Sequence, residues 1–257
     1  MSPGRPSRAL NGTDAPSDAP PTPTSSSTRK PVQTPKGPNI LDLGTGTGIW
    51  AIVMANFFWP VDIEGEWEGV EYNWDMIHAR MLVGQIFNWD HLYEKTFAHL
   101  RPGTGYFEQV DFDLTILSAD GSIVPGTVFH TWMTKYKEAM SKLGCSIDID
   151  GNAVRHKLRC AGFVDIEQEV IDVPVNPWEP GKEDIGRYMN LAYTHSLQAM
   201  SLRPLTRVCG MTPAEVNCLV QELGVEMCRL KWKPYVKLYI WTARRPDMAR
   251  APVSPVK

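Results

Sequence analysis

The chain has 257 residues, with 26 basic and 29 acidic side chains and five cysteines, which suits one domain of ordinary size. Its longest apolar run, residues 49–61, is well short of the roughly 20 residues that cross a bilayer, so no membrane-spanning segment is expected. The N-terminus has no apolar stretch typical of secretory signals, so we expect an intracellular protein of the nucleus or cytoplasm. The cysteines form no Cys-x-x-Cys pair and indicate free thiols rather than a disulfide or zinc framework.

Residues 1–38 differ in composition from the rest of the chain. They contain nine prolines, eleven Ser or Thr and no aromatic residue, so they cannot bury enough apolar surface to offset their chain entropy. We expect a disordered tail at 1–38, a folded domain at 39–246 and a flexible tail at 247–257. The chain after residue 38 has 21 basic and 27 acidic side chains. Direct nucleic-acid binding is not expected, because phosphate contacts require clustered positive charge.

From residue 39 onward, strand-like and helix-like segments alternate, which favours an α/β domain with a parallel sheet. Thr212 and Glu215 have the spacing of a capping box around Pro213, so a helix is expected to begin there. The other expected elements, in chain order, are a strand at 39–43, a helix at 49–57, a strand at 74–81, a helix at 89–100, a strand at 105–114, helices at 127–143 and 152–161, a strand at 164–173, a helix at 182–202 and a last strand at 235–243.

The strongest functional signal is the segment Ile40–Gly48, ILDLGTGTG, in which a strand leads through a glycine turn into the start of a helix. Such glycines let a ligand approach the backbone, and the N–H groups at the helix start attract negative charge. The G-x-G-x-G spacing lacks the glycine that a dinucleotide site would have at Ile49. The alternative is a glycine-rich loop that only joins a strand to a helix.

This segment resembles motif I of the class I S-adenosyl-L-methionine-dependent methyltransferases. The resemblance implies that Gly44, Thr45, Gly46 and Gly48 wrap the methionine end of the cofactor and that Asp42 orders its ammonium group. Further segments resemble the fungal LaeA-type methyltransferases, and the likeness spans roughly residues 39–246. These segments are Trp74–Met81, Trp89–Tyr93, Phe97–Gly103, Gly105–Val110 and Val175–Trp178.

The family resemblance implies a Rossmann-like class I methyltransferase fold, with a mostly parallel sheet, helices on both faces and helical insertions. It implies S-adenosyl-L-methionine as cofactor, no metal, and a role in fungal secondary metabolism or its regulation. The methyl acceptor would be a small molecule or a protein, and a velvet-type protein would be a partner.

In the family fold, the strands at 74–81 and 106–111 are the fourth and fifth, and their carboxyl ends open onto the cofactor cleft. His78 and Glu108 are therefore the candidate catalytic residues, and Arg80 is a candidate for cofactor binding. The alternatives are helix packing for His78, an ion pair for Arg80, and core or lid packing for the Trp and Met residues of the later helices. Methyl transfer is a direct displacement that requires alignment, and it needs a base only when the nucleophile must lose a proton.

One part of the family pattern is shortened. Residues 57–73, seventeen in all, separate the expected first helix from Trp74, whereas two strands, a helix and their connections need roughly 30. The stretch around Asp62 resembles the acid-containing segment that meets the adenine, so the second strand, with its ribose-binding acid, is expected to be lacking or degraded. Two alternatives follow: a catalytically impaired regulatory or scaffold protein that acts through partners, or an incomplete gene model.

Overall fold

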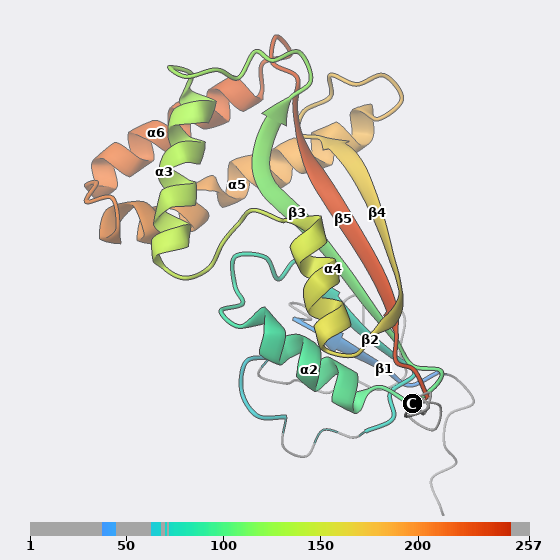
Figure 1. Ribbon diagram of the computed structural model, residues 1–257. Helices are drawn as coiled ribbons and strands as arrows, with labels where there is room; N and C mark the ends of the chain where they lie inside the picture. Colours follow the sequence, from blue (N-terminus) through green and yellow to red (C-terminus); the bar gives the residue numbers. More distant parts are fainter. Residues whose placement is uncertain (1–37, 45–62, 68–69, 71, 248–257) are drawn as a thin grey trace, which may run out of the picture. The chain divides into compact units, whose positions relative to one another are not determined.

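The computed structural model describes residues 38–44, 63–67, 70 and 72–247. Within this part the chain forms one five-stranded sheet with the order β1-β2-β3-β5-β4 (Figure 1). The strands β1–β2 and β2–β3 are parallel, and β5 is antiparallel to both of its neighbours. Four strands therefore run in the same direction and β5 alone is reversed, which confirms the expected α/β fold with a mostly parallel sheet. The expected helix at 49–57 and most of the shortened segment lie outside the described residues.

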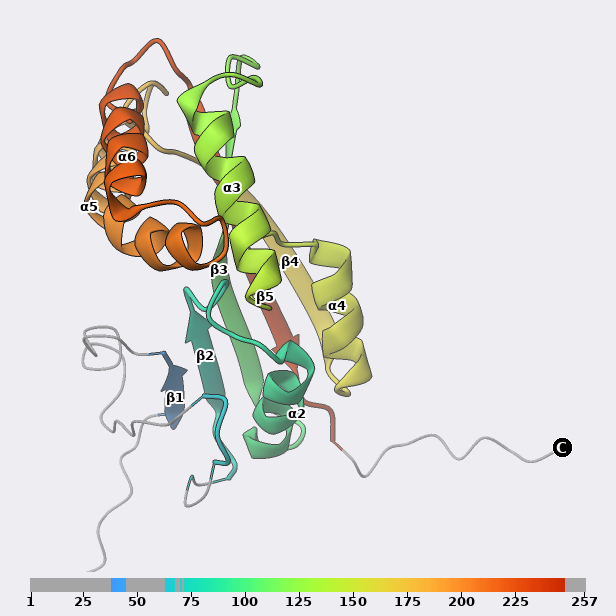
Figure 2. The same cartoon turned by 90° about the vertical axis from the view of Figure 1, so that its left-hand side faces the viewer.

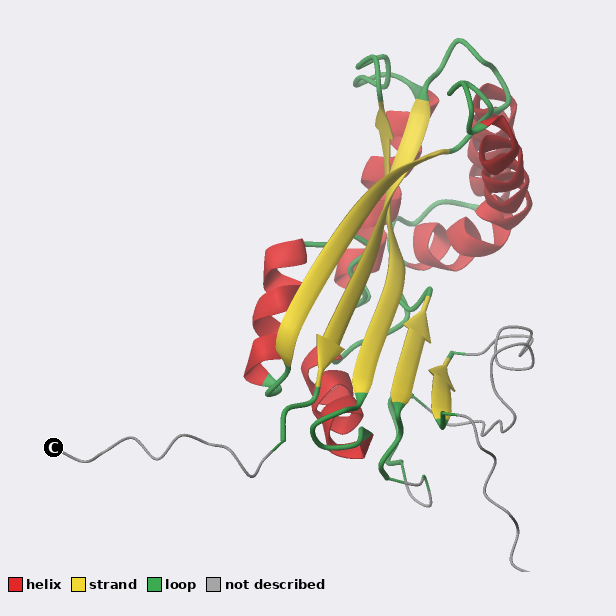
Figure 3. Ribbon diagram, turned by 90° about the vertical axis from the view of Figure 1, so that its right-hand side faces the viewer, coloured by secondary structure: helices red, strands yellow, loops and turns green. Residues whose placement is uncertain are grey.

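The strands differ greatly in length, and this difference divides the sheet. β1 (Ile40–Leu43) and β2 (Met76–Arg80) are short, whereas β3 (Tyr106–Ser118), β4 (Val164–Pro174) and β5 (Pro234–Arg244) continue past them. The β3–β5 ladder runs from Tyr106 to Ser118 with an irregularity between Asp113 and Leu117. The long strands thus project beyond the carboxyl ends of β1 and β2 (Figure 3).

Helices α2 (Trp89–His99) and α4 (Gly151–Cys160) cover one face of the sheet (Figure 2). Asn88 and Asp150 cap the two helices, and their side-chain oxygens accept hydrogen bonds from backbone N–H groups of the first turn. Beneath them lies a core in which strand side chains meet helix side chains, among them Leu41, Ile77, Phe107, Leu92 and Leu158.

Helices α3 (Val128–Lys142), α5 (Glu183–Arg207) and α6 (Pro213–Met227) pack together beside the far end of β3 (Figure 1). Trp132 of α3 is fully buried, and its Nε1 donates a hydrogen bond to Oγ of Ser201 on α5 at 2.7 Å. The capping box of Thr212 and Glu215 is confirmed at the start of α6. This packing fixes α3 and α5 next to the carboxyl end of β3. None of the described helices is long and apolar enough to cross a membrane.

Candidate functional site

Three of the polar candidates lie in one row across neighbouring strands. Asp42 of β1 is in register with His78 of β2, which is in register with Glu108 of β3. Their side chains project to one face of the sheet, opposite Leu41 and Ile77, because side chains alternate along a strand. Nδ1 of His78 lies 2.9 Å from Oε1 of Glu108. The two candidate catalytic residues thus form a hydrogen-bonded pair, in which His78 is buried with 3% exposure.

The carboxyl group of Asp42, near the end of β1, has a pKa that its surroundings shift. Burial raises its pKa above the ordinary value, while electrostatic interactions with His78 and Arg80 lower it. Arg80 is the exposed last residue of β2, so it stands at the carboxyl edge of the sheet. The positive charge of Arg80 therefore offsets part of the free-energy cost of burying the Asp42 carboxylate.

The turn after β1 begins with a glycine that the backbone requires. Gly44 has φ +71°, and a Cβ at this position would lie 2.6 Å from Cδ2 of Leu82. Any other residue there would have an unfavourable backbone conformation and would displace a buried side chain. The candidates Thr45, Gly46, Gly48 and Asp62 lie outside the described residues.

The loop that follows β2 is tied to β3 by Asp111, which is fully buried. Its Oδ1 accepts hydrogen bonds from the backbone N–H groups of Leu82 at 2.6 Å and Val83 at 3.1 Å. Its Oδ2 accepts one from Nε2 of Gln109 at 2.8 Å, and Oε1 of Gln109 accepts one from the Tyr93 hydroxyl at 2.9 Å. Burial raises the pKa of Asp111, and these donors oppose the shift. These hydrogen bonds therefore fix the backbone of the loop, at Leu82 and Val83, to β3.

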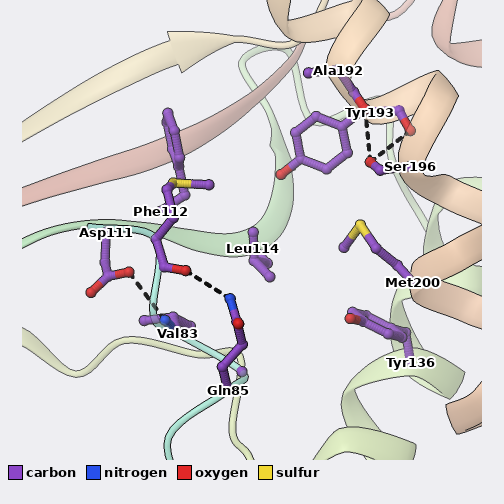
Figure 4. Close-up of a pocket in the computed structure, with 12 residues that line it drawn as sticks. Val83, Gln85, Asp111, Phe112, Leu114, Tyr136, Ala192, Tyr193, Ser196 and Met200 are labelled. Atoms are coloured by element: carbon purple, nitrogen blue, oxygen red, sulfur yellow. Dashed lines mark hydrogen bonds between the residues drawn. The ribbon is translucent and has the colours of Figure 1, made fainter. Parts of the chain in front are cut away.

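A cavity of about 430 Å³ lies beside this loop, between β3, α3 and α5 (Figure 4). Its volume falls in the range of small-molecule sites, roughly 300 to 1,000 Å³. Its lining is mostly apolar and includes Met81, Phe112, Leu114, Tyr136, Ala192 and Met200.

The polar side chains of the cavity lining differ in their hydrogen bonding. Nε2 of Gln85 donates to the carbonyl of Met81 at 2.8 Å, and Oγ of Ser196 donates to the carbonyl of Ala192 at 2.7 Å. The hydroxyl of Tyr193 is buried and has no hydrogen-bond partner among the residues that the structure describes. Tyr193 thus carries a buried, unpaired hydroxyl at the wall of a mostly apolar cavity.

The segment that precedes β2 is held by α2. Nζ of Lys95 donates hydrogen bonds to the carbonyls of Ile63 at 2.7 Å and Gly65 at 2.8 Å. Oε1 of Glu64 accepts a hydrogen bond from the backbone N–H of Phe87 at 2.7 Å. The backbone of this segment is therefore held by α2, and the side chain of Glu64 holds the residues just before that helix.

Sequence reasoning missed the residues around the cavity. Asp42, Gly44, His78, Arg80 and Glu108 do not line it. The signal for Asp111 is weak, because it is an acid in the middle of a strand that also contains Glu108 and Asp113. Tyr193 gives no such signal, since an aromatic residue in the middle of a helix is ordinary core material.

Comparison with known proteins agrees with this geometry. Residues 26–122 match a family model described as a methyltransferase domain. The chain is 36% identical over 238 residues to the secondary metabolism regulator LAE1 of Cochliobolus heterostrophus, and the aligned region covers 82% of this chain and 77% of that protein. It is 34% identical to the secondary metabolism regulator laeA of Fusarium oxysporum, with coverages of 84% and 78%. It is 32% identical to the protein-methionine methyltransferase laeA of Emericella nidulans, with coverages of 82% and 63%.

The strand order, the reversed β5 and the family match define a Rossmann-like methyltransferase domain. Within that class, the chain belongs to the LaeA/LAE1 family of secondary metabolism regulators. The resemblance noted in the sequence is thereby confirmed.

Proposed function

We propose that this chain binds S-adenosyl-L-methionine at the carboxyl end of β1 and transfers its methyl group, in the biosynthesis of fungal secondary metabolites or its regulation. The observation that carries the proposal is the pair formed by Asp42 and Gly44, a half-buried carboxylate two residues before a glycine at φ +71°. The carboxylate suits the cofactor's ammonium group. Leu82 packs so closely on Gly44 that the turn has no room for a Cβ.

In this proposal the domain at 39–246 performs the reaction, and each candidate residue has a role. Asp42 accepts hydrogen bonds from the ammonium group, and the turn of Gly44, Thr45, Gly46 and Gly48 encloses the methionine end. When bound, the cofactor supplies an electrophilic methyl group on a sulfonium. The chain's own task is then to align the acceptor and exclude water.

Four further candidates keep their roles as proposals. Arg80 and Asp62 contact the cofactor. His78 and Glu108 hold a proton between them at Nδ1, which matters when the acceptor must lose a proton on methylation.

Calorimetric titration with S-adenosyl-L-methionine tests this function. Saturable heat is expected for the natural chain, and Asp42→Asn should weaken binding by about tenfold to a hundredfold, because a hydrogen bond to a charged group is lost. Asp172→Asn is the matched control, since Asp172 is an exposed carboxylate on β4 that pairs with Lys237. The absence of heat from the natural chain at millimolar ligand would overturn the proposal.

The methyl acceptor is a small molecule or a protein, and the printed name of the Emericella nidulans relative supports a protein. The LaeA-type resemblance supports a velvet-type partner and an intracellular location in the nucleus or cytoplasm. Incubation of cell extract with the purified chain and methyl-labelled cofactor, followed by separation of protein from small molecules, distinguishes the two acceptor classes.

A second candidate function is regulation through partners without catalysis. One observation in its favour is that residues 57–73, seventeen in all, are few for a strand that would bind the cofactor's ribose. Another is that the Glu64 carboxylate of this segment is already engaged with the backbone N–H of Phe87. It predicts that Gly46→Asp leaves the biological phenotype unchanged. A lost phenotype with a folded mutant protein would contradict it.

A further inference from the structure

Leu82 lies between the start of the proposed cofactor turn and the cavity beside the loop after β2. Leu82 contacts Gly44 on one side, while its neighbours Met81 and Val83 line the cavity on the other. The carboxyl ends of parallel strands in open α/β sheets are where ligands bind. The cavity is therefore next to the place where the proposed methyl group would be held.

The chemistry of the cavity wall restricts what can enter. Its carboxylate, Asp111, already accepts three hydrogen bonds, and the polar atoms of Gln85 and Ser196 donate to carbonyls. Asp111 is the only charged side chain of the described lining, so a charged group would lose its hydration and find no other ion-pair partner there. A peptide backbone would be penalised in the same way, because each of its N–H and C=O groups needs a hydrogen bond. An uncharged, compact molecule is therefore favoured.

Tyr193 supplies a buried hydrogen-bond donor that such a molecule could meet. Its side chain is 6% exposed, and its hydroxyl has no partner among the described residues. Burial raises the pKa of this phenol, so it stays protonated and able to donate. Figure 4 shows the ring reaching from α5 into the cavity, with its oxygen directed toward the side formed by Phe112 and Leu114.

We propose that this cavity is the methyl-acceptor site and that Tyr193 selects an uncharged, largely apolar small molecule by donating a hydrogen bond to its carbonyl or ether oxygen. This inference rests on the proposed methyl transfer and narrows its substrate class. A neighbouring cavity of about 300 Å³ shares Tyr136 and Met200 with the first, which leaves room for a larger acceptor.

The test uses two probes of nearly the same shape, acetophenone and α-methylstyrene, which differ in a carbonyl oxygen against a methylene group. Binding is followed by NMR of the full chain labelled at the methionine methyl carbons, because Met81 and Met200 line the cavity. We expect both signals to shift, with acetophenone binding about tenfold more tightly, as one buried hydrogen bond implies. Tyr193→Phe should reduce this ratio to about one.

Ser196→Ala is the matched control. It removes a hydroxyl from the same wall, but one that already donates to Ala192, so the ratio should be unchanged. Equal affinity of the two probes for the natural chain, or a ratio that survives Tyr193→Phe, would overturn the proposal. Tighter binding of N-acetylmethionine methylamide than of acetophenone would also overturn it and assign the cavity to a protein side chain. Probe binding is read without cofactor, so its failure is distinguishable from a failure of the cofactor titration.

Discussion

Two buried tyrosines allow a direct test of the hydrogen bonding around the cavity. Tyr93 is 1% exposed and donates to Oε1 of Gln109 at 2.9 Å, whereas Tyr193 is 6% exposed and its hydroxyl has no partner among the described residues. Replacing Tyr93 by Phe removes a hydrogen bond and leaves the Gln109 carbonyl buried without a donor, which should lower the free energy of unfolding by about 1 to 3 kcal/mol. Replacing Tyr193 by Phe removes an unsatisfied group, so stability should be unchanged or rise by up to about 1 kcal/mol.

Equilibrium urea unfolding of the two variants and the natural chain measures this difference, with the midpoint read at constant slope. Each variant is the other's control, because both lose the same single oxygen from a buried ring. In thermal unfolding, 1 kcal/mol corresponds to a shift of about 2 to 4 °C for a domain of this size. A loss of more than about 1 kcal/mol in Tyr193→Phe, or equal losses in both variants, would refute the claim that the Tyr193 hydroxyl is free for a ligand.

Three further outcomes are expected. Gly44→Ala should lower the free energy of unfolding by about 1 to 2 kcal/mol because of its positive φ, and should weaken cofactor binding in calorimetry because Leu82 is displaced; unchanged values for both would contradict the role given to this turn. Gly186→Ala should cost at least about 2 kcal/mol in urea unfolding, since its Cβ would clash with the backbone carbonyl oxygen of Asn176, which cannot move as a side chain can; a neutral effect would show that α5 can shift. Asp111 has a raised pKa when folded, so its protonated form is favoured by folding, and its contribution to stability is full below pH 3.8 and declines as the pH rises through the folded pKa. Asp111→Asn should therefore reduce the loss of unfolding free energy as the pH rises from 3.8 through the folded pKa of Asp111. Urea unfolding over a pH series measures this, and a profile identical to that of the natural chain would contradict the prediction.

The local sequence was sufficient for most elements and insufficient where long-range contacts decide. The helix expected at 182–202 continues to Arg207 through Pro204, although proline disfavours helix at the residue before it. Pro204 and Leu205 are buried in the core between α3, α5 and α6, and this packing outweighs the local preference. Likewise the strand expected to end at Leu114 reaches Ser118, because β5 pairs with it beyond the irregularity.

The candidate site was predictable in part. The row of Asp42, His78 and Glu108 follows from strand register once the order of the strands is known. The alternatives stated for His78 were the cleft or helix packing, and the structure adds a hydrogen bond to Glu108 of the neighbouring strand. Asp75, just before β2, accepts a hydrogen bond from the backbone N–H of Asn39 at 2.8 Å.

The cavity was not predictable, because its walls come from segments as far apart as Met81 and Met200, which meet only through tertiary packing. The expectation of core packing for the Trp and Met residues of the helices holds for Trp132 and Met133. Met200 instead lines the cavity, and its sequence neighbourhood does not distinguish it from the buried ones.

The loop held by Asp111 links the affinities of the two proposed ligands. Leu82 contacts the proposed cofactor turn, and Met81, held at φ +59°, lines the acceptor cavity. A ligand on either side therefore acts on the same short stretch of backbone. By thermodynamic linkage, whatever factor the cofactor contributes to acceptor affinity, the acceptor must contribute equally to cofactor affinity.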